Sequence, residues 1–253
     1  MHTSKQPATL TRSNWSNLTC QNPLFSIILT TSNNPGLLRL NLENLVQILA
    51  GTESNYEVII ADDSNLEKFT ANTQQYEALF DWLTQLDFPF HFIYSAMFDH
   101  EGKKDYGLAS ARNQGICNAR GKVLLFLDHR VSPRNRESID SLIKPHLYSS
   151  KKIWAYGAKL SKGLEYVPEN YPFVENYSSI TKHAIVRAGM FCERVNEYGG
   201  MTLELTLRFA KQGFTFLYIK DSISTVLAAS PDRAEKDAIS QLTAAFVKKI
   251  YFD

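Results

Sequence analysis

The sequence predicts an α/β protein with a mainly parallel central sheet flanked by helices, and three observations carry this prediction. Strand-like and helix-like segments alternate from Phe25 to Leu142, as expected for right-handed βαβ units. Val123–Leu127 is an unbroken apolar run, which is typical of a parallel strand covered on both faces. Hydrophobicity then stops at Asp128. Ligands of such sheets bind outside the carboxyl ends of the strands, so this position is the first candidate site.

The composition limits the class of protein. The chain has 253 residues, of which 44% are hydrophobic, and a formal net charge of +1. One core and one domain are expected at this size, and the charge gives no reason to expect nucleic acid or membrane lipid as a partner. No apolar run is long enough for a transmembrane segment, and three scattered cysteines without a CxxC argue against a disulfide framework or zinc site. We expect a cytoplasmic protein.

Within this single domain, residues 1–22 lack the apolar core of a signal peptide, and we expect a loosely ordered lead-in there. Residues 23–150 hold the regular alternation, and residues 151–253 are less regular and end in a helix. Strands are expected at Phe25–Leu29, Glu57–Ala61, Phe90–Tyr94, Val123–Leu127, Ile153–Leu160 and Thr215–Ile219. Helices are expected from Leu37, around Tyr76–Leu83, over Leu108–Ala119, around Ile139–Ile143 with an end near Pro145, and over Ala234–Ile250. The last helix has an apolar stripe of Ile239, Leu242, Phe246 and Ile250, with Lys248 and Lys249 outward.

Polar residues follow three of the expected strands. Thr30 and Thr31 follow the first strand, without the GxGxxG of a dinucleotide site. Asp62 and Asp63 follow the second strand, and Asp128 ends the fourth. Each of these, taken alone, also fits an ordinary structural role as a helix start, a helix cap or a polar turn.

Two blocks of the sequence carry a resemblance. Around Asp128, the matching residues are Ala111-Arg112-Asn113, Gly115, Gly121 and Phe126-Leu127-Asp128. In the second block they are Gly189, Phe191, Glu193, Tyr198, Gly199, Gly200, Glu204, Leu205, Arg208 and Gly213. Together they resemble family-2 glycosyltransferases of the GT-A fold, in which a helix containing ARN precedes an LFLD strand and an Asp-x-Asp motif. The first turn, with Thr31, Asn33 and Pro35 in register, resembles the same family.

The resemblance implies a nucleotide-diphospho-sugar transferase fold, with a nucleotide-binding half over residues 23–150 and an acceptor-side half after them. It implies that the donor is a nucleotide-diphosphate sugar, with a UDP-sugar favoured. The implied nucleotide-binding residues are Thr30, Thr31, Asp62, Asp63, Arg112 and Asp128. In this scheme Asp63 accepts a hydrogen bond from the base and Asp128 faces the ribose. Lys104 could clamp phosphate, although loop lysines are more often solvated.

Three positions depart from the family pattern. Arg130 stands at the last Asp of Asp-x-Asp, Met201-Thr202 replaces a Glu-Asp pair, and Asp221–Thr225 lacks the late metal-binding His. In the family these positions serve one divalent ion and one base. Arg130 cannot ligate a cation, but a guanidinium matches a diphosphate in shape and charge. We therefore expect Arg130 to replace the ion, so that no metal cofactor is needed, with a surface arginine as the alternative. His129 could approach phosphate or fill the slot between Asp128 and Arg130, and the filling role is favoured.

Glu204 is the candidate base by its family match, but it lies one helical turn after the replaced acid pair, so a structural role is the alternative. Asp105, His183 and Glu197 are other candidates for the base. Two function classes follow. The first is an active, metal-independent glycosyltransferase of the hexosyltransferase type. The second is a catalytically degenerate GT-A domain that binds a sugar nucleotide or a partner without transfer. A nucleotidyl transferase is disfavoured because the first strand is not followed by a Gly-rich loop. The sequence does not identify the sugar, the acceptor or the oligomeric state.

Overall fold

The computed structural model of the chain describes residues 9–14, 22–51, 55–95, 107–149, 151–161, 164–165, 173, 175–195, 200–228, 241 and 243–250. The strands are β1 (Thr9–Ser13), β2 (Phe25–Thr31), β3 (Tyr56–Asp62), β4 (Phe90–Ser95), β5 (Val123–Asp128), β6 (Val131–Pro133), β7 (Ile153–Ser161), β8 (Leu164–Glu165), β9 (Tyr177–Thr181) and β10 (Thr215–Val226). The helices are α1 (Pro35–Leu49), α2 (Leu66–Ala71), α3 (Thr73–Gln85), α4 (Leu108–Asn118), α5 (Arg136–Leu147), α6 (Lys182–Arg187) and α7 (Met201–Lys211).

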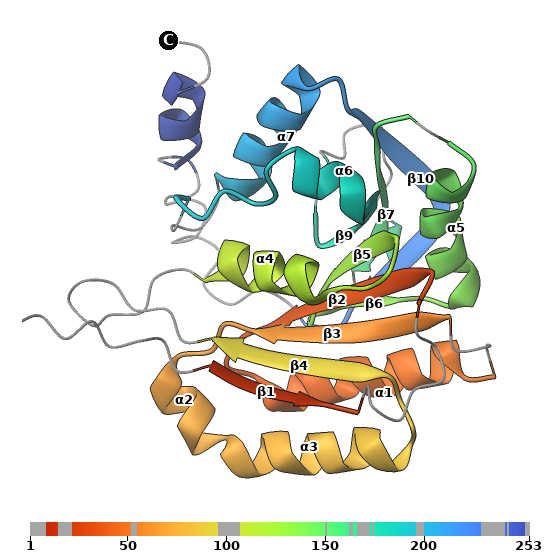
Figure 1. Cartoon of the computed structure of the whole chain (residues 1–253), viewed down its shortest axis with the longest axis vertical. Coiled ribbons are helices and arrows are strands. Elements are labelled where there is room, and N and C mark those ends of the chain that lie inside the picture. Colours follow the sequence, from red (N-terminus) through yellow and green to blue (C-terminus); the bar gives the residue numbers. More distant parts are fainter. Residues whose placement is uncertain are drawn as a thin grey trace, which may run out of the picture.

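The strands form a single sheet in the order β1-β4-β3-β2-β5-β9-β7-β10-β6, with β8 beside β7 (Figure 1). The four strands β4, β3, β2 and β5 are mutually parallel, as the alternating sequence predicts. Strand β9 then runs antiparallel to both β5 and β7, and parallel pairing returns between β7 and β10. The sheet is therefore mixed, and its parallel part is the half that carries the three polar strand ends.

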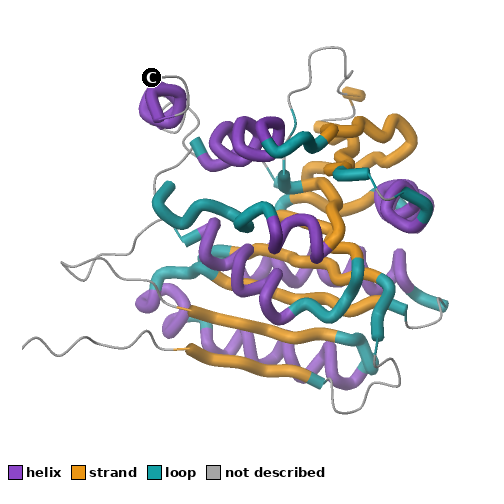
Figure 2. Tube along the Cα trace, turned by 45° about the horizontal axis from the view of Figure 1, so that its top comes forward, coloured by secondary structure: helices purple, strands orange, loops and turns teal. Residues whose placement is uncertain are grey.

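Helices cover both faces of the sheet (Figure 2). Because side chains alternate along a strand, Ile27 and Leu29 of β2 enter one core while Ile28 enters the other. The first core lies under α1, α2, α3 and α5, and the second under α4, α6 and α7. Helix α4 approaches the sheet closely, since a Cβ on Gly115 would stand 2.5 Å from Cγ2 of Ile28. A small residue is needed there, as the sequence pattern of this helix predicts.

The amino-terminal region differs from its prediction. Residues 9–13 are not a loose lead-in but form β1, which pairs antiparallel with β4 from Thr9↔Ser95 to Ser13↔His91. The side chain of Asn14 extends this contact, because its Nδ2 donates to the Phe88 carbonyl at 2.6 Å and its Oδ1 accepts from the Phe90 amide at 3.1 Å. The apolar run of β4 predicts a strand but contains no signal for an antiparallel neighbour from the start of the chain.

Helix α5 ends at Leu147, near Pro145 as predicted. Pro145 lies in the last turn, where it cannot donate a hydrogen bond to the carbonyl four residues earlier. The helix at the carboxyl-terminal end differs from its prediction. In the carboxyl-terminal helix, described at residues 241 and 243–250, Val247 is buried beside Gly200 while Phe246 and Ile250 are more than 60% exposed. Phe246 and Ile250 of the expected apolar stripe therefore do not lie on the packing face, and Ile239 and Leu242 lie outside the described residues. None of the helices in the described part of the chain combines the length and apolar character needed to cross a bilayer.

Candidate active site

The three polar strand ends meet at one edge of the sheet. In the ladders, Thr30 of β2 is the partner of Asp128 on β5, and Thr31 is the partner of Asp62 on β3. Main-chain hydrogen bonds extend this alignment past the strands, from the His129 amide to the Thr30 carbonyl (2.9 Å) and from the Asp63 amide to the Thr31 carbonyl (3.0 Å). The predicted convergence of these residues is therefore present. The Thr30 hydroxyl donates to the Leu127 carbonyl at 3.1 Å and ties β2 to β5.

The two acids that follow β3 occupy different environments. Asp63 lies against the start of α4, where a Cβ added to Gly107 would stand 3.1 Å from the Cβ of Asp63. Asp62 is 2% exposed and accepts a hydrogen bond from the Ser64 amide at 2.6 Å. Burial raises the pKa of Asp62 to about 6, although hydrogen bonds from Ser64 and Tyr76 oppose the shift. Asp63 therefore lies on the α4 side of the site, whereas Asp62 belongs to a buried polar cluster.

Arg130 and Asp128 form a two-point ion pair. Nε of Arg130 donates to Oδ1 of Asp128 at 3.0 Å, and Nη2 donates to Oδ2 at 2.9 Å. The main-chain amide of Arg130 adds a third bond to Oδ1 at 2.9 Å. Burial alone would raise the pKa of Asp128, but the hydrogen bonds and charge of Arg130 together lower it to about 2. The carboxylate is thus ionised and already neutralised by a neighbouring cation.

The turn that carries this pair is held from two other elements. Asn41, fully buried on α1, donates through Nδ2 to the carbonyls of His129 (3.0 Å) and Val131 (2.9 Å). The amide of Leu227, just after β10, donates to the Arg130 carbonyl at 2.8 Å. The end of β10 therefore lies beside Arg130. Sequence reasoning missed Asn41, although an asparagine on the stripe of Leu38, Leu42 and Leu45 was a detectable signal.

His129 fills the slot between Asp128 and Arg130, as predicted. Its side chain is buried, with Nδ1 located 3.3 Å from the Thr30 carbonyl and 3.4 Å from Oδ1 of Asp128. Burial lowers the pKa of His129, so the imidazole is neutral at physiological pH. A neutral histidine adds no charge to the site.

The ARN segment of α4 connects the two motif blocks. Arg112 is 1% exposed, and its Nη1 donates to Oε1 of Glu175 at 2.9 Å. Oε2 of Glu175 accepts from the Thr202 hydroxyl at 2.5 Å, at the start of α7. Asn113 makes reciprocal bonds of 2.9 Å with the main chain of Phe191. The structure thus gives Arg112, expected at the nucleotide, a buried carboxylate partner.

Glu175 and Lys159 are charged residues of the site that sequence reasoning missed. Glu175 brings a carboxylate to Thr202, the position where the family has an acid. Burial lowers the pKa of Lys159, on β7, to about 8, and the charges of Glu175, Asp128, Arg112 and Arg130 also act on this pKa. Both residues come from the irregular second half of the chain, where no motif marks them.

Glu204, the candidate base, forms an ion pair with Arg208 rather than with residues of the Asp128–Arg130 turn. Its Oε1 accepts from Nε of Arg208 at 2.6 Å, one helical turn along α7. Arg208 continues to the carbonyls of Ala188 (2.5 Å) and Met190 (2.6 Å), so the pair fastens α7 to the end of α6. The geometry gives Glu204 a structural contact, and its role as a base stays a prediction. Lys104, Asp105 and Glu197 lie outside the described residues.

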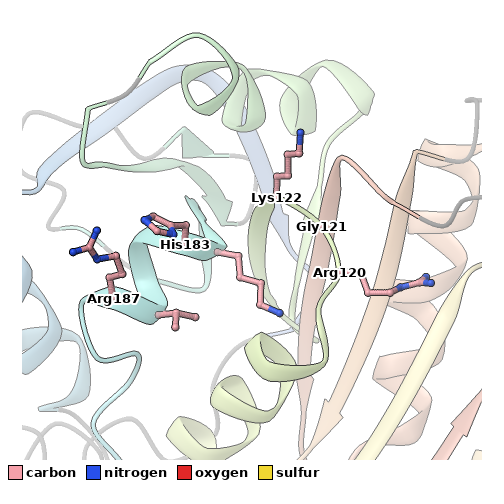
Figure 3. A pocket seen from close by; sticks show the side chains of 7 residues that line it. Arg120, Gly121, Lys122, His183 and Arg187 are labelled. Atoms are coloured by element: carbon pink, nitrogen blue, oxygen red, sulfur yellow. The ribbon is translucent and has the colours of Figure 1, made fainter.

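A cavity of about 550 Å³ lies elsewhere, at the amino-terminal end of β5 (Figure 3). Basic residues line it, including His183 and Arg187 of α6. Figure 3 shows the side chains of Arg120 and Lys122 pointing in different directions. Nε of Arg120 donates to Glu57 at 2.8 Å, so this arginine has a structural partner. The cavity is at the opposite end of β5 from Asp128 and takes no part in the candidate site. His183, one of the alternative candidates for the base, lines this cavity and therefore lies away from the candidate site.

The sheet order, the helical layers and the polar strand ends define a GT-A architecture. Residues 26–130 match the family model of Glycosyl transferase family 2. This match covers the three strand ends and Arg130, and the second motif block lies beyond it. The resemblance to family-2 glycosyltransferases is thereby confirmed over residues 26–130. No curated protein sequence matches the chain.

Solved structures with the same fold include two glycosyltransferase complexes. A mannosyltransferase from Pyrobaculum calidifontis in complex with GDP-Man and Mn²⁺ aligns with a TM-score of 0.64 and 17% identity over 90% of this chain. GalNAc-T7 with UDP, GalNAc and Mn²⁺ aligns with a TM-score of 0.63 and 15% identity over 92% of this chain. The alignments cover 64% and 49% of those two chains, respectively. These similarities confirm the GT-A fold.

The donor set at Asp128 does not fit the Mn²⁺ that both of those complexes contain. Hard divalent ions bind several oxygen ligands. Here both oxygens of Asp128 are hydrogen-bonded to Arg130, and a guanidinium occupies the place next to them. In the described part of the chain, no three His, Cys, Asp or Glu side chains are grouped so that they could hold a metal ion.

Proposed function

We propose that this protein transfers a sugar from a nucleotide-diphosphate donor to an acceptor and uses Arg130 in place of a divalent ion. The family match and the GT-A fold support glycosyl transfer as the general reaction. By the family resemblance, Asp63 would accept a hydrogen bond from the uracil or other base, and a UDP-sugar is the favoured donor. The nucleotide would lie across the ends of β2, β3 and β5, in contact with Thr30, Asp63 and Asp128.

The observation that carries the proposal is the ion pair between Asp128 and Arg130. Sugar transfer releases a nucleoside diphosphate, whose growing negative charge must be stabilised. Arg130 is 28% exposed at the sheet edge, and its guanidinium is oriented by two bonds to Asp128. A permanently charged, oriented guanidinium stabilises such a leaving group without a metal, because its N–H groups match phosphate oxygens.

Nucleotide binding with and without metal tests this proposal. Calorimetry with UDP and UDP-sugars should give the same affinity in EDTA and in Mn²⁺, and transfer or hydrolysis of the sugar nucleotide should proceed in EDTA. Binding that requires Mn²⁺ or Mg²⁺ would show that Arg130 does not replace the ion. Absence of binding to any nucleotide would overturn the proposal as a whole.

A second candidate function is a GT-A domain that binds a sugar nucleotide or a partner without transfer. It is favoured by the contacts of the two acids nearest α7. Glu175 is paired with Arg112 and Glu204 with Arg208, so each carboxylate already has an arginine partner. Nucleotide binding in EDTA without turnover, across a panel of sugar nucleotides and acceptors, would favour this function over transfer.

A further inference from the structure

A buried side chain of helix α1 supports the turn between β5 and β6. Nδ2 of Asn41 donates to the carbonyls of His129 at 3.0 Å and Val131 at 2.9 Å. The same nitrogen also donates to the Asp128 carbonyl, at 3.3 Å. A side-chain amide has two N–H groups, so the three carbonyls share them. One fully buried side chain thus binds main-chain oxygens on both sides of Arg130.

Asn41 departs from the apolar pattern of its own helix. It lies on the buried stripe of α1 with Leu38, Leu42 and Leu45, at the spacing of a packing face. Its Oδ1 is buried and has no hydrogen-bond partner in the described part of the chain. An unsatisfied buried acceptor lowers stability, so packing alone would favour an apolar residue at this position. Such departures from a local pattern are expected where a residue serves a functional site.

The strand ladders on either side of the turn do not fix it. Strand β5 pairs with β2 and β9, whereas β6 pairs with β10 at the edge of the sheet, and only His129 and Arg130 separate the two strands. The Arg130 carbonyl accepts from the Leu227 amide at 2.8 Å. Among the described hydrogen bonds to the carbonyls of the turn, those of Asn41 are the ones that a side chain makes. A substitution at Asn41 can therefore loosen the turn without changing its own sequence.

We propose that Asn41 is a positioning residue for sugar transfer, because it fixes the main chain from which Arg130 presents its guanidinium to the diphosphate of the donor. This inference rests on the proposed function and adds to it a residue that acts through the turn. The guanidinium is oriented by its main chain and by two bonds to Asp128. Hydrogen bonds weaken steeply when they are misaligned, so a displaced turn would weaken the contact of Arg130 with phosphate oxygens.

The test compares Asn41→Leu with the wild type by calorimetry in EDTA. Leucine is close to asparagine in shape and has no N–H group to donate. UDP affinity should fall by about 10-fold, the effect of losing a hydrogen bond to a charged group. Uridine, which has no phosphate, should bind both proteins equally. In an Arg130→Ala background, Asn41→Leu should change UDP affinity no further, because Asn41 acts through Arg130.

Asn14→Leu is the matched control for the loss of a buried amide. Asn14 is also buried, and its Nδ2 donates to the Phe88 carbonyl at 2.6 Å, beside the outer strands β1 and β4. Both leucine variants should lower the unfolding midpoint, but Asn14→Leu should keep the UDP affinity of the wild type. Asn41→Thr keeps one hydroxyl donor and is the milder variant for the same measurements if Asn41→Leu does not fold.

A second measurement needs no nucleotide. The coupling energy between Asp128 and Arg130, from Asp128→Asn and Arg130→Met in urea unfolding, should be smaller in the Asn41→Leu background than in the wild type. It should be unchanged in the Asn14→Leu background. This comparison separates a displaced turn from a general loss of stability, because both backgrounds lose a buried amide.

Unchanged UDP affinity in Asn41→Leu would overturn the inference and leave the proposed function intact. Equal losses of UDP and uridine affinity would also overturn it, because Asn41 would then be only structural. If the wild type itself binds no nucleotide, the proposed function fails first. The coupling energy then decides the inference: a value that is the same in the wild type and in Asn41→Leu shows that Asn41 does not position Arg130, and a smaller value in Asn41→Leu shows that it does.

Discussion

The guanidinium of Arg130 contacts both oxygens of Asp128, with Nε–Oδ1 at 3.0 Å and Nη2–Oδ2 at 2.9 Å. By the family resemblance, these residues stand at the first and last positions of the Asp-x-Asp motif. The carboxylate and the guanidinium neutralise each other, and the Arg130 side chain is 28% exposed. This geometry is the basis of the proposal that Arg130 takes the place of a divalent ion.

Arg130 should be required for nucleotide binding in EDTA. Arg130→Ala is expected to weaken UDP binding by about 1.5–3 kcal/mol, the range for hydrogen bonds to charged groups. Arg39→Ala is the matched control, because Arg39 also pairs with a carboxylate, Glu43 on α1 at 2.7 Å, and stacks on Trp82 of α3. Calorimetry on both variants checks the expectation. Equal UDP affinities in Arg130→Ala and the wild type would remove Arg130 from the binding site.

Arg130→Asp should restore dependence on a metal. The substitution recreates two carboxylates two residues apart at the end of β5, which is the ligand type that Mn²⁺ and Mg²⁺ prefer. UDP should then bind weakly in EDTA and more tightly as Mn²⁺ is added, while wild-type binding stays unchanged by either. If Mn²⁺ has no effect on the variant, the turn cannot hold a metal even with both acids present.

Asp63 should affect nucleotide binding more than an exposed acid does. It lies beside Gly107 at the start of α4, on the side of the sheet that carries the Asp128 pair. Asp63→Ala is expected to lower UDP affinity by about 10-fold, because a hydrogen bond to a charged group is lost. Asp81→Ala, on the exposed surface of α3, serves as the control. Calorimetry that gives equal affinities for the two variants would exclude Asp63 from the base pocket.

The parallel half of the fold could be predicted because its signals are local. The apolar runs of β2, β3 and β5 are buried at every position, and each ends where polar residues begin. Consecutive parallel strands place their carboxyl ends together, so Thr30, Asp63 and Asp128 could be grouped from sequence alone. Short-range patterns suffice where the chain alternates regularly.

The remaining part of the site depends on contacts that no local pattern encodes. Arg112 meets Glu175 across 63 residues, and Asn41 reaches the turn after β5 across nearly ninety. Lys159 enters the site only because β9 runs antiparallel between β5 and β7. Such pairings depend on the strand order of the second half, which apolar runs alone do not determine.

Arg112 and Glu175 should show a large coupling energy in a double-mutant cycle of the free energy of unfolding. Arg112→Met leaves a buried carboxylate without its cation, and about 3–5 kcal/mol of stability should be lost. The double variant Arg112→Met/Glu175→Gln should recover part of this loss, because no unpaired charge remains. The half-buried i,i+4 pair Arg39–Glu43 should show a coupling energy of only about 0.5 kcal/mol. Urea unfolding of both double-mutant cycles provides the measurement, and similar coupling in the two pairs would contradict this account.

Asp62 should make stability fall as pH rises from about 4 to about 6. Burial raises its pKa from 3.8 to about 6 in the folded protein, so the folded state binds this proton more tightly than the unfolded state. Its stabilising contribution is therefore fully present below pH 3.8 and is lost as pH rises through 6. Raising this pKa from 3.8 to about 6 corresponds to about 3 kcal/mol of the free energy of unfolding.

Asp62→Asn keeps an oxygen for the Ser64 amide and removes the charge, so the variant should be more stable than the wild type at pH 7 but not at pH 4. Urea unfolding of both proteins at several pH values from 4 to 7.5 measures this difference, with Asp81→Asn as the exposed control. A stability difference between wild type and Asp62→Asn that stays constant across this range would show that Asp62 does not titrate there.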